Sequence, residues 1–136
     1  MKKKLLLLSI PLLISMAVIS QTKPVKIVFD ITSKDTLAHQ AVLRHVSLMA
    51  ASYPESQFEV VVYGSALPML LKDKSTIEKG LTALTPNRNV SFKACATTMK
   101  RYNVDQSHLI SGVGVVKDAI MEIVTKQGEG WGYIKE

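Results

Sequence analysis

The chain has 136 residues, with 17 Lys and Arg against 11 Asp and Glu, and a formal net charge of +6. Hydrophobic residues make up 47%, enough for a packed core, which excludes a chain that is disordered throughout. A single cysteine excludes an intramolecular disulfide and a multi-cysteine metal site. Aromatic residues are only 6% and the basic residues are dispersed among acids, so we expect no nucleic-acid partner.

The N-terminus has the pattern of a secretory signal peptide. Three lysines at positions 2–4 precede the apolar run Leu5–Ile19. We therefore expect residues 1–20 to be a signal peptide cleaved before Gln21, and residues 21–136 to be a single exported, periplasmic domain with no further membrane association. An uncleaved N-terminal anchor is the alternative. Cleavage removes three lysines and no acids, which lowers the net charge from +6 to +3.

The first half of the mature chain predicts two strands and one long helix. Val25–Ile31 is nearly continuous and β-branched, as in a buried strand. Thr32–Asp35 has the form of a capping box, and a helix is expected from there to about Tyr53. Its expected buried stripe is Leu37, Ala38, Ala41, Val42, Leu48 and Met49. Phe58–Tyr63 predicts a second strand, and Ala66–Leu71 a short apolar turn or helix that a small domain would leave partly exposed.

The second half continues the alternation of helices and strands. Ser75–Glu78 is a second capping box, and Asn103 is a plausible left-handed cap. The predicted elements are a helix to about Leu84, strand Asn89–Ala94, helix Thr97–Tyr102, strand Val113–Val116, helix Asp118–Gln127 and strand Trp131–Ile134. The last helix is expected to bury Ala119, Ile120, Ile123 and Val124. This alternation predicts a three-layer α/β/α sandwich with a mostly parallel five-stranded sheet, in which the direction of the last strand stays open.

Ligand sites in such folds lie beyond the carboxyl ends of the strands. The turn after the first strand has no glycine and carries two acids, so we expect no phosphate cradle there and no cofactor. Three residues at this edge are candidate cleft residues: Asp30, Gly64 and Ser65.

Cys95 is the candidate catalytic residue, because it stands where a strand gives way to a helix. The positive end of the helix dipole favours a thiolate. Five neighbours are candidate groups for stabilising the anion: Lys93, Thr97, Thr98, Lys100 and Arg101. Since Lys93 and Cys95 share one face of the strand, we predict an accessible thiol of low pKa. The alternative is an inert cysteine that packs as a small hydrophobe.

The three histidines show no metal-ligand spacing, and we predict no metal site. His45 is expected on the apolar side of the first helix, with His39 off the main stripe. His108, in the Asp105–Leu109 turn, could fold back towards Cys95 as a base.

Several segments resemble the DsrE/DsrF-like family of sulfur-relay proteins. They are KIVFDI, VVVYGSALPMLL, FKACATTM, GVGVV and QGEGWGYIK, and the resemblance covers essentially the whole mature chain. Its most specific element is Cys95 in the pattern A-C-x-x-T. The resemblance implies a three-layer fold, homo-oligomers such as trimers or hexamers, and, in some members, a persulfide on the matching cysteine. The best-understood members are cytoplasmic, whereas this chain carries an export signal.

These observations predict a sulfur carrier or sulfur-transfer protein that holds a persulfide on Cys95 and exchanges sulfur with donor and acceptor proteins. One alternative is a non-catalytic oligomeric module that binds a small anion or a partner protein in the same cleft. Another is redox pairing between chains through Cys95.

Overall fold

The computed structural model describes residues 23–136, so the predicted signal peptide and its cleavage site lie outside the described residues. Within residues 23–136, no helix is both long and apolar enough to cross a membrane. The strands are β1 (Lys26–Ile31), β2 (Gln57–Val62), β3 (Val90–Cys95), β4 (Gly114–Val116) and β5 (Gly132–Lys135). The helices are α1 (Thr36–Ser52), α2 (Glu78–Leu84), α3 (Ala96–Arg101) and α4 (Ala119–Gly128), with 3-10 helices η1 (Gly64–Leu70) and η2 (Gln106–His108).

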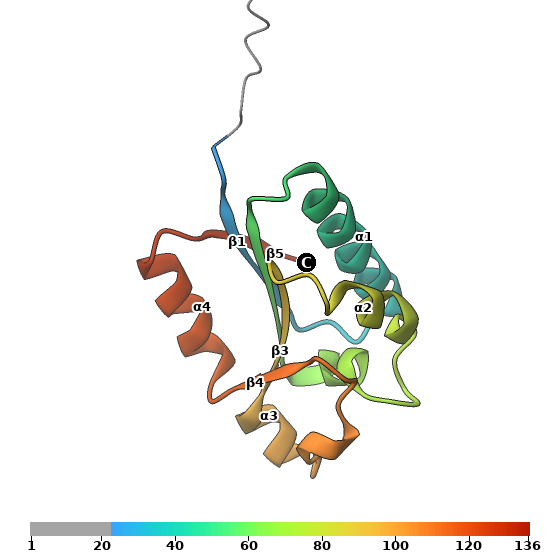
Figure 1. Ribbon diagram of the computed structural model, residues 1–136. Coiled ribbons are helices and arrows are strands. Elements are labelled where there is room, and N and C mark those ends of the chain that lie inside the picture. Colours follow the sequence, from blue (N-terminus) through green and yellow to red (C-terminus); the bar gives the residue numbers. More distant parts are fainter. Residues whose placement is uncertain (1–22) are drawn as a thin grey trace, which may run out of the picture.

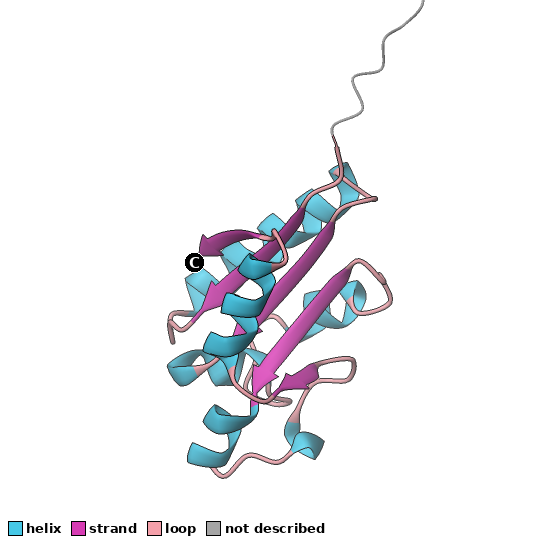
Figure 2. Ribbon diagram, turned by 90° about the vertical axis from the view of Figure 1, so that its left-hand side faces the viewer, coloured by secondary structure: helices cyan, strands magenta, loops and turns pink. Residues whose placement is uncertain are grey.

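The five strands form one sheet in the order β4-β3-β2-β1-β5, and every pair is parallel. Figure 1 shows α1 and α2 on one side of this sheet and α4 on the other. The connection from β4 to β5 crosses the sheet in the direction opposite to the first connections. A right-handed crossover in that direction must cover the opposite face, where Figure 2 shows α4 in front of the strands. The predicted three-layer α/β/α fold is confirmed, and the last strand is parallel to its neighbour β1.

The face under α1 and α2 holds the main hydrophobic core. Phe29, Phe58 and Phe92 are each 1% exposed and come from three adjacent strands. The helix η1 adds Ala66, Leu67, Met69 and Leu70, all buried. The expectation that this short element leaves its apolar residues exposed is therefore wrong: η1 closes the end of the core.

The rotation of α1 about its axis differs from the predicted one. Asp35, not Thr32, is the N-cap, and its carboxylate accepts the Leu37 backbone N–H at 2.9 Å. Leu37 and Leu48 are exposed, and the residues that face the core are His39, Val42, Val46 and Ala50. The second capping box is also absent, because α2 begins at Glu78 after an N-cap, Ile77, that makes no side-chain hydrogen bond. Asn103 does adopt the expected left-handed conformation, with φ of 52°.

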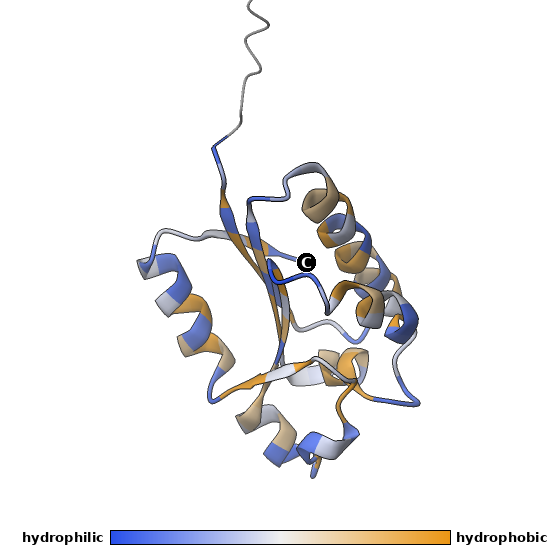
Figure 3. Cartoon of the chain, viewed as in Figure 1, coloured by the Kyte–Doolittle hydropathy of each residue, from blue (hydrophilic) through white to orange (hydrophobic). Residues whose placement is uncertain are grey.

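The face under α4 holds a smaller cluster. Its buried residues are Val28, Val61, Cys95, Ala119 and Ile123. Ile120 and Val124, which were expected in the buried stripe, are more than half exposed. Figure 3 shows apolar and polar residues interleaved along the ribbon of α4. One helix thus covers this face, and α4 itself keeps exposed apolar side chains.

A buried carboxylate helps to attach α4 to the sheet. Glu59 of β2 is 4% exposed, accepts the Ser91 hydroxyl at 3.1 Å and lies 3.5 Å from Lys126 Nζ. Lys126 also pairs with Glu122 at 3.6 Å and lies over the Trp131 ring. Burial raises the pKa of Glu59 above its ordinary value of 4.5 despite the opposing attraction of Lys126, and Glu122 raises it further.

The variant Glu59→Gln should make the free energy of unfolding less sensitive to rising pH. The raised pKa means that a protonated Glu59 favours the folded state. That contribution is complete below the unfolded value, near 4.5, and is lost as pH rises through the folded pKa. Urea unfolding between about pH 4 and pH 8 measures it. The exposed carboxylate variant Glu55→Gln is the control, and equal pH slopes in the two variants would contradict the account.

Candidate functional site

A cavity of about 400 Å³ lies at the edge of the sheet where α3 and α4 begin. We call it the cysteine cavity. Its lining residues are Thr32, Tyr63, Gly64, Cys95, Thr97, Thr98, Arg101, Asp118, Ala119 and Ile120. Strand β4 lies beside β3, so the chain that leaves β4 starts α4 close to the start of α3. The cavity is therefore bounded by the first turns of two helices.

Cys95 is both the last residue of β3 and the N-cap of α3. Its side chain lines the cavity, yet the residue is only 4% exposed, so the prediction of an accessible thiol is wrong. The pKa of the thiol is shifted in the predicted direction, downwards. Burial alone would raise the pKa of the thiol. Hydrogen bonds from the backbone of Thr98 and Ala119, the Thr98 hydroxyl and the backbone of Thr97 outweigh burial, and the pKa lies below its ordinary value of 9.0.

Thr98 links two parts of the site. It is buried, and its hydroxyl oxygen accepts the backbone N–H of Gly64 at 3.1 Å. That bond orients the hydroxyl, whose hydrogen is left to donate to the sulfur of Cys95. Gly64 has φ of +60°, a conformation that glycine adopts without the strain of a side chain. The turn after β2 therefore helps to fix a donor that stabilises the thiolate.

The charged groups of the cavity are Arg101 and Asp118. Arg101 lies in the last turn of α3 and is exposed to solvent at the mouth. Asp118 is the N-cap of α4, and its carboxylate accepts the backbone N–H of Met121 at 3.0 Å. Asp118 is negatively charged and already caps α4. Arg101 is therefore the charged side chain of the cavity that can bind an incoming anion.

Tyr63 forms another wall of the cavity. Burial, followed by the negative charge of Asp30, raises the pKa of its phenol, so the ring stays neutral and keeps its proton at neutral pH.

The structure brings together Cys95, Thr97, Thr98, Arg101 and Gly64, and it places the other predicted residues elsewhere. Lys93 packs against β4, where its Nζ would lie 3.0 Å from a Cβ added at Gly114. Lys100 is exposed and lies outside the cavity lining. The Ser65 hydroxyl donates to the carbonyl oxygen of Thr32 at 2.7 Å.

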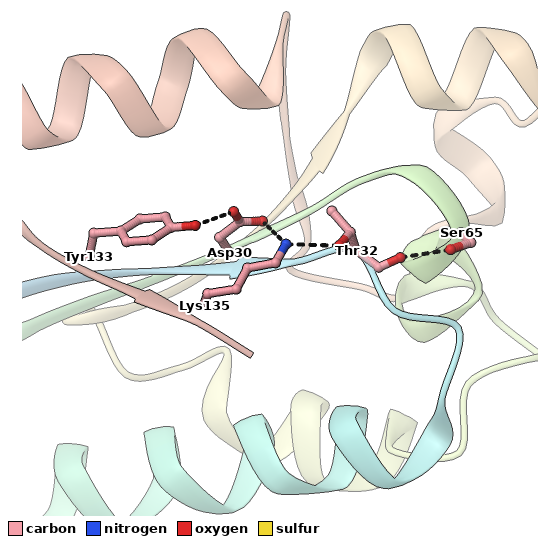
Figure 4. Close-up of polar contacts among 5 residues, drawn as sticks. All are labelled: Asp30, Thr32, Ser65, Tyr133 and Lys135. Atoms are coloured by element: carbon pink, nitrogen blue, oxygen red, sulfur yellow. Dashed lines mark hydrogen bonds and ion pairs between the residues drawn. The ribbon is translucent and has the colours of Figure 1, made fainter.

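Asp30 lines a neighbouring cavity rather than that of Cys95. Its carboxylate accepts the Tyr133 hydroxyl at 2.7 Å and Lys135 Nζ at 3.0 Å, as Figure 4 shows. Lys135 Nζ also donates to the Thr32 hydroxyl at 2.8 Å.

The histidines take no part in the cysteine cavity. His39 is buried, and its Nε2 donates to the Ser33 carbonyl at 2.8 Å. His45 is exposed and pairs with Glu136 at 2.6 Å, so its expected apolar position is wrong. His108 pairs with Asp105 and does not fold back onto Cys95. Across residues 23–136 there is no group of three or more His, Cys, Asp and Glu side chains placed to hold a metal ion.

Five lining residues were not among the predicted site residues: Thr32, Tyr63, Asp118, Ala119 and Ile120. Tyr63 lies between the end of β2 and Gly64, which was predicted as a cleft residue. Its position at the carboxyl edge of the sheet could therefore have identified it from the sequence. The sequence does not indicate that Ala119 and Ile120 line the cavity, because their position next to Cys95 depends on which strand lies beside β3.

The model of the DsrE/DsrF-like family matches residues 26–135, from the start of β1 to the end of β5. The chain belongs to the DsrE/DsrF-like family. Membership places it in a sulfur-relay-type family and confirms the resemblance found in the sequence. Among curated proteins, none matches the chain.

Solved structures agree with the DsrE/DsrF-like fold. A protein of unknown function, MTH1491 from Methanobacterium thermoautotrophicum, is 30% identical with a TM-score of 0.76, covering 82% of this chain and 99% of that one. The ychN protein from E. coli is 17% identical with a TM-score of 0.69, covering 85% and 100%. BT1422 from Bacteroides thetaiotaomicron is 12% identical with a TM-score of 0.65, covering 82% and 94%. The last two support the fold alone.

Proposed function

We propose that this DsrE/DsrF-like protein is a sulfur carrier that holds a persulfide on Cys95. The Cys95 thiolate attacks the terminal, sulfane sulfur of a donor; a new S–S bond forms on Sγ, and the S–S bond of the donor breaks. A second thiolate then attacks the outer sulfur, and Cys95 leaves as the thiolate. The observation that carries the proposal is the set of hydrogen bonds from Thr97, Thr98 and Ala119 that stabilise the Cys95 anion within a cavity.

The hydrogen bonds to Cys95 assist both the loading of sulfur onto Cys95 and its release to the acceptor thiol. A thiolate of low pKa forms readily at neutral pH and is also a better leaving group. The cavity of about 400 Å³ gives the added sulfur atom room beside Cys95, and Arg101 at its mouth suits an anionic sulfur species. The low exposure of Cys95 disfavours a disulfide between two chains, because two such thiols cannot meet without movement of the backbone.

Intact-mass measurement after incubation with polysulfide or thiosulfate tests the proposal. We expect the protein to gain the mass of one sulfur atom, to lose it on treatment with a reducing thiol, and to gain none in the Cys95→Ser variant. A gain that persists in Cys95→Ser, or no gain at all, would contradict the carrier role. No gain would leave the non-catalytic module as the better account, and a dimer mass lost on reduction would favour pairing between chains.

We further propose that the mature chain starts near Gln21 in the periplasm and forms a homo-oligomer. The charged and apolar N-terminal pattern supports export. Leu37 and Leu48, both exposed on the outer side of α1, supply apolar surface for self-association. N-terminal sequencing of the periplasmic protein tests the first statement, and light scattering at micromolar concentration tests the second.

A further inference from the structure

A second cavity, of about 210 Å³, adjoins the cysteine cavity along α4. We call it the side lobe. It shares Tyr63 and Ile120 with the cysteine cavity and is completed by Asp30, Ile123, Val124, Gln127 and Tyr133. Because the same two side chains line both cavities, the side lobe adjoins the space beside Cys95.

The side lobe has mainly apolar walls and one hydrogen-bonded acid. The walls are the rings of Tyr63 and Tyr133 and the aliphatic side chains Ile120, Ile123 and Val124. The acid is Asp30, whose side chain is 8% exposed and already holds Tyr133 and Lys135 (Figure 4). Lys135 balances the charge of Asp30, so the side lobe presents no free cation to an inorganic sulfur anion.

The two cavities therefore favour different parts of a ligand. Backbone N–H groups and Arg101 suit the reactive, anionic sulfur in the cysteine cavity. The aliphatic and aromatic walls of the side lobe suit carbon, and each methylene that becomes buried there strengthens binding about fourfold. Its volume of about 210 Å³ is below the range of pockets for drug-sized ligands, about 300–1,000 Å³, so the carbon body is short.

We propose that the sulfur donor of Cys95 is a small organic persulfide whose short carbon body occupies the side lobe. The inference rests on the proposed carrier function and names the class of its substrate. In the transfer, Cys95–S⁻ attacks the terminal sulfur of R–S–SH, the R–S–SH sulfur–sulfur bond breaks, and Cys95–S–SH and R–S⁻ result. The step moves one sulfane sulfur and requires no external oxidant or reductant.

Filling the side lobe tests the inference. Val124 lines the lobe and is 54% exposed, so Val124→Trp adds bulk there without opening the core. Met121 is 60% exposed on the same helix and lines neither cavity, so Met121→Trp is the matched control. The measurement is the rate of sulfur loading on Cys95, followed by intact mass, from three donors: propyl hydropersulfide, a persulfidated peptide and inorganic polysulfide.

We expect Val124→Trp to lower the ratio of the propyl to the polysulfide rate about tenfold, and Met121→Trp to leave that ratio within about twofold of wild type. An unchanged ratio in Val124→Trp, with Cys95 still loaded, would overturn the inference alone. If Val124→Trp slows loading from a persulfidated peptide but not from propyl hydropersulfide, the inference is overturned in favour of a macromolecular donor. No loading of the wild type from any donor would overturn the carrier function, and the inference with it.

Discussion

The variant Thr98→Val should raise the pKa of Cys95, because it removes a hydrogen bond to the thiolate, and a hydrogen bond to a charged group is worth about 1.5–3 kcal/mol. Valine nearly matches threonine in shape but removes the hydroxyl that donates to the Cys95 sulfur and accepts the Gly64 N–H. A higher pKa means a smaller thiolate fraction at neutral pH. A more basic thiolate is also more nucleophilic, so alkylation and sulfur loading below the pKa should slow about threefold for each unit of the increase.

The measurement is the rate of iodoacetamide alkylation from about pH 5 to pH 9, which reports the pKa of the thiol. The control is Thr98→Ser, which keeps the hydroxyl and should titrate close to wild type. A Thr98→Val protein that stays folded and titrates as wild type would show that the backbone N–H groups of Thr98 and Ala119 hold the thiolate without the side chain.

The variant Phe29→Ala should lower the free energy of unfolding by about 3–5 kcal/mol. Phe29 lies in β1, between Val60 of β2 and Ile134 of β5, and is 1% exposed. Truncation to alanine loses the apolar burial of the ring and leaves a cavity in the main core. Since small domains unfold with about 5–15 kcal/mol, this single change would remove a large share of the stability.

Urea unfolding of the wild type, Phe29→Ala and Phe29→Leu measures the effect. Leucine fills much of the same volume and should cost about 1.5 kcal/mol or less. A loss below about 1 kcal/mol in Phe29→Ala would mean that the core around β1 collapses onto the gap or is less closely packed than the structure shows.

The strands and their connections could be predicted from the sequence because buried parallel strands are short, β-branched runs bounded by turn residues. The position of Cys95 at the carboxyl edge of the sheet could be predicted in the same way, because Cys95 ends such a run. The faces of β3 were also predictable: Phe92 and Ala94 belong to the main core, and Cys95 to the cluster under α4.

Helix rotation and strand order could not be predicted in the same way. The N-cap of α1 is Asp35 and not Thr32. The buried face of the helix is centred on Val42 and Val46, and Leu37 lies outside it. Ala119 reaches Cys95 only because β4 lies beside β3, a contact set by the sheet order. Lys93 shares the face of Cys95, but two residues along a strand span about 6.6 Å, and its side chain packs on β4.

The most direct test of the carrier role follows one sulfur atom through the cycle. Cys95 is first loaded with isotopically labelled sulfane sulfur, and the isolated protein is then mixed with an excess of an acceptor thiol in a single turnover. The account predicts that the label leaves the protein and appears as the outer sulfur of the acceptor persulfide, with Cys95 regenerated as a thiol and Cys95→Ser carrying no label at any stage. Label that stays on the protein, or that leaves without any acceptor persulfide being formed, would contradict it.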